Sequence, residues 1–109
     1  MSGSLLIYGA TGFTGRLLAE VAKSRGMRPT LSGRDDTELR RLAEALDLPF
    51  RTATLDDAGA VNAALAGADV LLNAAGPFSL TAGPLIEACL SLGIHYLDIS
   101  AECAAVQCN

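Results

Sequence analysis

The sequence predicts an α/β protein with a doubly wound parallel sheet. Three observations support this fold class. Apolar runs typical of strands alternate with helix-like segments along the chain, and such alternation produces right-handed β-α-β units with helices on both faces of a parallel sheet. The first apolar run, Leu5–Tyr8, is continuous, as expected for a strand buried on both faces. A turn with three glycines joins it to the first helical pattern.

The individual elements follow from periodicity and from residues that start or end helices. In the first helix, Phe13, Leu17, Leu18 and Val21 recur on one face, which we expect to be buried. Pro84 suits the first position of the last helix, because a proline there needs no backbone donor. The predicted strands are Leu5–Tyr8, Pro29–Ser32, Phe50–Leu55, Ala68–Ala75 and Ile94–Ile99, and the predicted helices begin near Phe13, Asp35, Ala58 and Pro84.

Aspartates stand where the middle helices should begin. Asp35 is followed three residues later by Glu38, a spacing that resembles a capping box. Asp56 or Asp57 is placed to cap the helix that starts at Ala58.

Composition and charge narrow the class of protein. A chain of 109 residues, half of them apolar, should fold as one domain spanning residues 1–109. The net charge of −4 and the lack of a basic run argue against nucleic acid or an anionic membrane as the partner. The three cysteines lack metal-binding spacing and only one histidine is present, so we expect no metal site and a reduced, cytoplasmic location.

The expected strand order is 3-2-1-4-5, as in Rossmann-like folds. The order reverses between strands 1 and 4, and ligands of such sheets bind outside the carboxyl ends of the strands at that point. Two loops meet there, Gly9–Gly15 and Asn73–Phe78.

The glycine turn has the spacing Gly-x-x-Gly-x-x-Gly, with Gly9, Gly12 and Gly15. A helix N-terminus presents free N–H groups to an anion, and glycine lets a pyrophosphate approach the backbone. We therefore expect Gly9, Thr11, Gly12 and Phe13 to contact a dinucleotide. Tight turns without a ligand are the alternative. A P-loop is excluded, because no Lys-Ser/Thr pair follows the last glycine.

The end of the second strand should select the nucleotide. An acidic residue there accepts the ribose hydroxyls of NAD, whereas an arginine accepts the additional phosphate of NADP. Arg34 precedes the acidic residue Asp35, and its guanidinium can donate two parallel hydrogen bonds to a phosphate. Ser32 offers a hydroxyl donor. These residues favour NADP over NAD. In the alternative interpretation Asp35 binds the ribose of NAD and Arg34 is a solvated loop charge.

Four segments together resemble one family. GATGFTG (Gly9–Gly15), SGR (Ser32–Arg34), NAAGPF (Asn73–Phe78) and GIHYLD (Gly93–Asp98) occur in order. They are similar to the NADP-binding N-terminal domain of the saccharopine dehydrogenase-like family, including its trans-acting enoyl reductase branch. The resemblance implies a nicotinamide cofactor and hydride transfer to an imine or enoyl substrate. Family members are several times longer, and a second domain shapes their substrate pocket.

The resemblance leaves two function classes open. One is the cofactor-binding domain of an oxidoreductase, and the other is a non-catalytic NADP(H)-sensing module. Ala75, Gly76 and Pro77 are expected to line the nicotinamide side of the groove, although a rigid turn explains them equally well. No catalytic residue is identified, so we expect the chain alone to have no reductase activity. The apolar strand Ile94–Ile99 is predicted to be an exposed edge that forms a homodimer.

Overall fold

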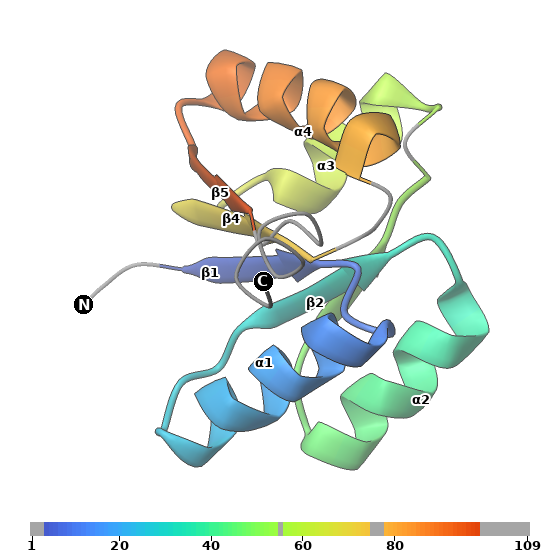
Figure 1. The fold of residues 1–109 in the computed structure, drawn as a ribbon, viewed down its shortest axis with the longest axis vertical. Coiled ribbons are helices and arrows are strands. Elements are labelled where there is room, and N and C mark those ends of the chain that lie inside the picture. The colour runs from blue at the N-terminus through green and yellow to red at the C-terminus, as the bar shows by residue number, and fades with distance from the viewer. Residues whose placement is uncertain (1–3, 55, 75–77, 99–109) are drawn as a thin grey trace, which may run out of the picture.

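The computed structural model describes residues 4–54, 56–74 and 78–98. Strands and helices alternate throughout this part of the chain, as Figure 1 shows. The strands are β1 (Leu5–Tyr8), β2 (Thr30–Gly33), β3 (Phe50–Thr52), β4 (Val70–Asn73) and β5 (His95–Asp98), and the helices are α1 (Phe13–Ser24), α2 (Asp36–Leu46), α3 (Ala58–Leu65) and α4 (Phe78–Leu92). The bounds of β1 and α3 are those predicted, whereas β3, β4 and β5 are shorter than predicted.

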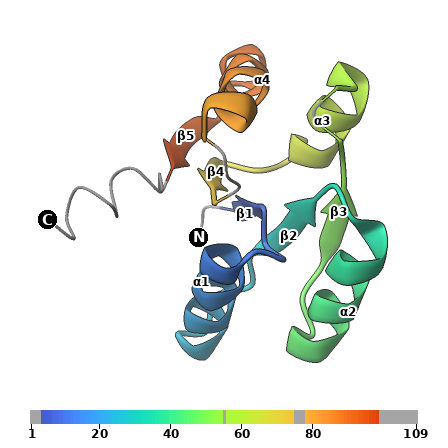
Figure 2. The ribbon, with the colours of Figure 1, turned by 45° about the vertical axis from the view of Figure 1, so that its right-hand side comes forward.

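The strands form one parallel sheet in the order β3-β2-β1-β4-β5, which confirms the predicted fold class. Helices α1 and α2 cover one face of the sheet, and α3 and α4 cover the other (Figures 1 and 2). Tyr8 at the end of β1 is in register with Asn73 at the end of β4. The reversal of strand order therefore lies at these two carboxyl ends, as expected for a doubly wound sheet.

Alternate residues of β1 pack in two separate hydrophobic cores, one on each face of the sheet. Leu6 and Tyr8 pack with α3 and α4, in a cluster that includes Val61, Leu71 and Leu85. On the opposite face, Ile7 packs beneath α1 and α2, in a cluster with Ala10, Ala19, Leu31, Leu39, Leu42, Ala43 and Leu48. Because both faces of β1 are buried, its unbroken apolar sequence is explained.

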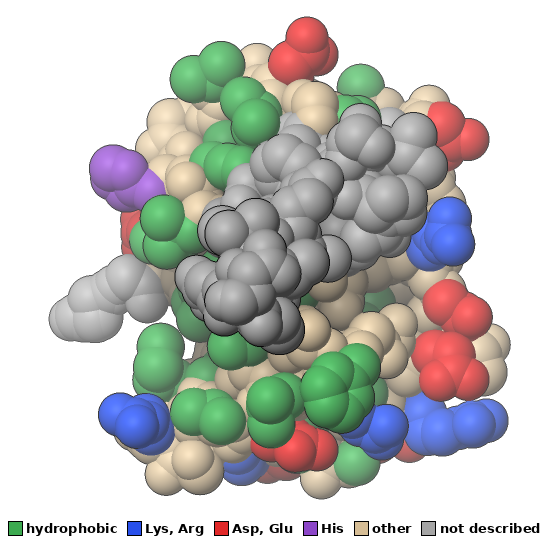
Figure 3. Space-filling view, in the orientation of Figure 1, with side chains coloured by type: hydrophobic (Ala, Val, Ile, Leu, Met, Phe, Trp, Pro, Cys, Tyr) green, Lys and Arg blue, Asp and Glu red, His purple; other side chains and the backbone are tan. Residues whose placement is uncertain are grey.

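The predicted buried face of α1 was wrong for Phe13, Leu17 and Val21, whereas Leu18 is half-buried and packs against the core on that side of the sheet. The buried residues of α1 are Gly15, Ala19 and Ala22, whereas Phe13 is 87% exposed and the large apolar residues Leu17 and Val21 are also exposed. Small side chains allow the helix axis to lie close to the sheet and to the glycine turn. Periodicity alone favoured the larger residues, which instead form an apolar surface along α1 (Figure 3).

The start of α4 also differs from the prediction. The helix begins at Phe78, and Pro84 lies inside it. A proline in a helix removes one backbone hydrogen bond. The turns that follow bury Leu85, Ala88 and Cys89 against the sheet. We infer that this burial outweighs the lost hydrogen bond, so the helix continues through the proline.

Long side chains connect the outer elements. The guanidinium of Arg51, in β3, donates to the backbone carbonyls of Ala64 and Ala66 at 3.2 and 2.7 Å, and thus caps the end of α3. The Thr52 hydroxyl donates to the Asp36 carboxylate at 2.7 Å and joins β3 to α2. The same carboxylate accepts from Arg40 at 3.0 Å, and these two hydrogen bonds lower the pKa of Asp36.

Replacing Gly15 with alanine should destabilise the fold. The added Cβ would overlap the carbonyl oxygen of Gly9 and lie 2.8 Å from Cα of Ala10. We expect Gly15→Ala to lower the free energy of unfolding by about 1–3 kcal/mol, the usual cost of overpacking, although alanine favours helices more than glycine does. Urea denaturation followed by circular dichroism would measure the change.

Gly12→Ala is the matched control. Its Cβ would lie 3.5 Å from the Gly9 oxygen, which is an ordinary contact distance. Its stability should stay within about 0.5 kcal/mol of the wild type, as for most surface substitutions. If Gly15→Ala were as stable as Gly12→Ala, the close packing of α1 on the glycine turn would be contradicted.

Candidate functional site

The glycine turn is held at the carboxyl end of β2 by one carbonyl. The N–H groups of Gly9 and Ala10 both donate to the carbonyl oxygen of Ser32, at 2.8 and 3.1 Å. Gly9 has a φ of 83°, a backbone conformation that side chains rarely allow. On the other side, the N–H of Ala74 donates to the Tyr8 carbonyl at 2.8 Å. These bonds fix the turn directly above the point where the strand order reverses.

The N-terminus of α1 differs from those of α2 and α3. Asp35 caps α2 by accepting from the N–H of Glu38, and Asp57 caps α3 by accepting from the N–H of Ala60, each at 3.1 Å. In α1 the N-cap is Gly12, without a side-chain cap and without an acidic residue in the first turn. Gly12 is also exposed. The positive end of this helix is therefore open to an anionic group, and no Cβ blocks the approach.

Arg34 lies at the carboxyl end of β2, directly after its last residue. Its guanidinium is close enough to act on Tyr8 at the end of β1, where it opposes the larger effect of burial, and the pKa of Tyr8 is raised overall. Arg34 thus brings positive charge toward the glycine turn. Asp35 instead uses its side chain to cap α2, which confirms the predicted cap.

Ser32 does not have the expected role. Its side chain is fully buried, and its hydroxyl donates to the Arg51 carbonyl at 2.6 Å. The expectation that this hydroxyl would donate to a phosphate is therefore wrong in this structure, because the hydroxyl donates its hydrogen bond to a backbone carbonyl of the adjacent strand β3. Ser32 contributes through its backbone carbonyl, which anchors the glycine turn.

A side-chain hydrogen bond joins Asn73, at the carboxyl end of β4, to Tyr96 within β5. The side-chain amide of Asn73, 1% exposed, donates to the Tyr96 hydroxyl at 3.0 Å. The Tyr8 hydroxyl donates to the Ala53 carbonyl at 2.9 Å and fixes the segment after β3. These two hydrogen bonds satisfy polar groups of β1, β4 and β5 within the described part of the sheet. The residues of the loop after β4 that are expected to contact the cofactor, Ala75, Gly76 and Pro77, lie outside the described residues.

Sequence reasoning missed two arginines beside the turn. Arg16 of α1 and Arg41 of α2 line a small cavity of about 30 Å³ together with Thr11, Glu38 and Leu42. Thr11 is half-buried, so it belongs both to the turn and to this cavity. The sequence offers no signal for this grouping, because it depends on how α1 and α2 lie beside each other.

A larger hollow of about 690 Å³ lies between α3 and α4 and is lined by residues such as Asp56, Asn62 and Glu87. None of its lining residues comes from the glycine turn. No group of at least three His, Cys, Asp or Glu side chains suited to a metal ion occurs within residues 4–54, 56–74 and 78–98. In the same part of the chain, no helix has the length and apolarity needed to cross a membrane.

Comparison with known proteins connects this geometry to a family. The family model described as the saccharopine dehydrogenase NADP binding domain matches residues 5–108. A trans-acting enoyl reductase from Mycobacterium bovis is 34% identical over 105 residues, which cover 90% of this chain and 25% of that protein. The chain thus spans about a quarter of the length of the curated relatives that it matches.

Solved structures share the fold. Saccharopine dehydrogenase (L-Glu forming) from Saccharomyces cerevisiae superposes with a TM-score of 0.77 at 16% identity, covering 96% of this chain and 24% of that one. Triphenylmethane reductase from Citrobacter sp., solved in complex with NADP(H), superposes with a TM-score of 0.75 at 21% identity, covering 87% of this chain and 36% of that one.

Proposed function

Because the chain belongs to the family of saccharopine dehydrogenase NADP binding domains, we propose that residues 1–109 form one dinucleotide-binding domain that prefers NADP(H). The observation that carries the proposal is the open N-terminus of α1. It follows a glycine turn at the reversal of strand order and lacks the aspartate cap present in α2 and α3. A pyrophosphate at Gly12 would provide the missing acceptors.

The preference for NADP(H) is inferred from the charges around the turn. Arg34 follows β2 and supplies a guanidinium that can bind a ribose 2′-phosphate. The carboxylate that could bind the ribose of NAD, Asp35, already accepts the N–H of Glu38. We propose contacts to the dinucleotide from Gly9, Thr11, Gly12 and Phe13, and from the loop residues Ala75, Gly76 and Pro77.

The complete reaction needs more protein than this domain. We propose that the longer members of the family use the bound cofactor for hydride transfer, with an imine or an enoyl group as substrate, and that substrate-binding residues lie outside residues 1–109. The relatives named trans-acting enoyl reductases support an oxidoreductase. We also propose a cytoplasmic location, since Cys89 is a buried free thiol of the kind common in reducing compartments.

We further propose a homodimer through β5. This strand is an edge of the sheet, and an unpaired edge favours association. Leu97 in β5 is 58% exposed. At the opposite edge, the Arg51 side chain covers the end of α3, which makes β3 less suited to pairing.

Nucleotide selection by Arg34 can be measured by calorimetric titration. The wild-type chain should bind NADP(H) roughly ten- to hundredfold more tightly than NAD(H), because a hydrogen bond to a charged group contributes about 1.5–3 kcal/mol. Arg34→Ala should remove most of this preference and leave the affinity for NAD(H) nearly unchanged. The preference should also decrease with added salt, since Arg34 is exposed. Equal affinities in the wild type would count against selection by Arg34, and a stronger NAD(H) affinity that is lost in Asp35→Ala would identify Asp35 as the selecting residue.

Gly12→Val tests the phosphate position. The extended backbone at Gly12, with φ −74° and ψ 170°, accepts a β-branched residue, so the fold should be retained. The new side chain would occupy the proposed pyrophosphate site and abolish binding of both nucleotides. Fluorescence titration with NADPH would measure binding, and the melting temperature would verify the fold. A folded Gly12→Val variant with wild-type affinity would place the pyrophosphate elsewhere.

Light scattering at high protein concentration tests the dimer. The wild type should have the mass of a dimer, and Leu97→Asp should have the mass of a monomer, because a charge would be buried at the interface. Leu90→Asp is the matched control, since Leu90 is 78% exposed on α4 rather than in β5. A monomeric wild type, or equal effects of the two substitutions, would count against association through β5.

A further inference from the structure

Two neighbouring arginines of α2 lie on different sides of the helix. Arg40 is occupied by other parts of the fold: it forms an ion pair with Asp36 at 3.0 Å, and its guanidinium lies 5.6 Å from the centre of the Phe50 ring in β3. Arg41 makes no ion pair with any described residue. It lines the cavity between α1 and α2. The guanidinium of Arg40 therefore stabilises the packing of α2, whereas the guanidinium of Arg41 is available to bind a ligand.

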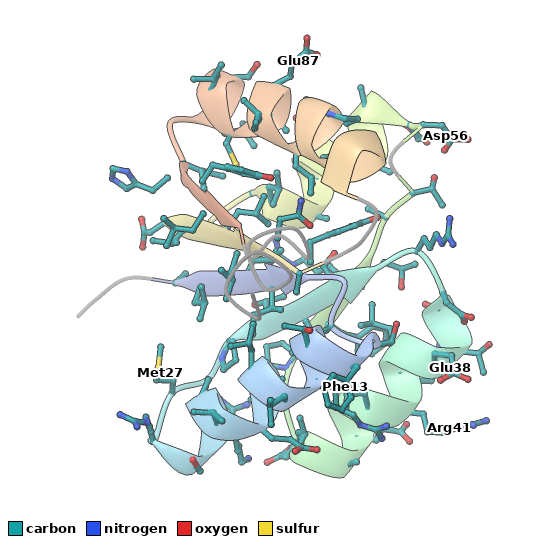
Figure 4. All side chains as sticks on the ribbon, in the orientation of Figure 1. Phe13, Met27, Glu38, Arg41, Asp56 and Glu87 are labelled. Atoms are coloured by element: carbon teal, nitrogen blue, oxygen red, sulfur yellow. The ribbon has the colours of Figure 1, made fainter. Side chains whose placement is uncertain are left out.

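The cavity beside Arg41 is positively charged. Arg16 lines it from α1, and its pairing with Glu20 is weak, with 3.9 Å between Nε and Oε2 at an exposed site. Thr11 brings a hydroxyl from the glycine turn, and Glu38 is the one acidic residue in the lining. Figure 4 shows Glu38 and Arg41 projecting from the outer side of α2, with the end of the Arg41 side chain pointing away from Phe13 at the start of α1.

We propose that Arg41, together with Thr11 and Arg16, forms a second phosphate-binding position that shares the ribose 2′-phosphate with Arg34. This inference rests on the proposed nucleotide function and adds residues to it. Thr11 connects the cavity to the turn over which the ribose would lie. Two guanidiniums and a hydroxyl offer several donors to a phosphomonoester dianion. The cavity, of about 30 Å³, has room for about one small group. We therefore expect the phosphate to lie at the opening of the cavity, with the side chains of Arg16 and Arg41 around it.

The acidic residue Glu38 provides a second test of the proposed phosphate position. Glu38 lines the same cavity, and the negative charge of its carboxylate would repel a phosphate dianion. Removing that charge should therefore strengthen phosphate binding, whereas removing Arg41 should weaken it. Opposite charges alone give effects of opposite sign, so the comparison that identifies a direct contact is the size of the Arg41 effect relative to that of its neighbour Arg40.

The test is calorimetric titration of the 109-residue chain with adenosine 2′,5′-bisphosphate and with AMP, which differ only in the 2′-phosphate. Arg41→Ala should lower the affinity for the bisphosphate about threefold to tenfold, between the values for an exposed ion pair and a charged hydrogen bond. The affinity for AMP should not change. Glu38→Gln should raise the affinity for the bisphosphate about twofold to threefold, as expected for removing one like charge at a surface.

Arg40→Ala is the matched control, because it removes the same charge from the next residue. It should leave the preference for the bisphosphate intact, although it loses the contacts with Asp36 and Phe50. Melting temperatures will show that all variants are folded, and Arg41→Lys should retain part of the affinity. If Arg41→Ala behaves like Arg40→Ala while the wild type prefers the bisphosphate, the role of Arg41 is overturned and the NADP(H) proposal stands. A wild type that binds both compounds equally would overturn both.

Discussion

The candidate site depends on the contact between the backbone of Gly15 in α1 and the carbonyl of Gly9. A single Cβ at residue 15 would overlap this oxygen. Because the contact exists, α1 lies tightly against the turn, and its small residues Ala19 and Ala22 can pack against the sheet. The turn itself is anchored by the Ser32 carbonyl, which accepts two of its N–H groups. The open end of the helix is consequently fixed above the carboxyl ends of β1 and β4.

Capping explains why this helix end differs from the others. An aspartate at the N-cap stabilises a helix by about 1 kcal/mol, and α2 and α3 both have one. In α1 a glycine takes this place, so the helix lacks that stabilisation and its N-terminal N–H groups have no side-chain cap. Positive charges also occur close to the glycine turn. Arg34 acts on Tyr8 at the end of β1, and Arg16 and Arg41 line a cavity together with Thr11.

The errors in prediction have two identifiable physical causes. In α1, hydrophobic periodicity selected Phe13, Leu17 and Val21, but close helix packing required the small residues instead. In α4, Pro84 suggested a helix start, yet the helix begins six residues earlier at Phe78, and the burial of later turns favours its continuation. Both errors arise because a local sequence pattern gives no information about the shape of the surface against which the helix packs.

By itself, the sequence determined the order of strands and helices, the position of the glycine turn and the aspartate that caps α2, and it limited the cap of α3 to Asp56 or Asp57, of which the structure selects Asp57. These features depend on residues close together in the chain, such as apolar runs, glycine spacing and a side chain that reaches an N–H three residues away. Only the tertiary structure decided that the Ser32 hydroxyl binds the Arg51 carbonyl, and that Arg40 and Arg41 face different neighbours. Those outcomes depend on which distant segments lie against each residue, and the packing of the sheet and its helices sets that arrangement.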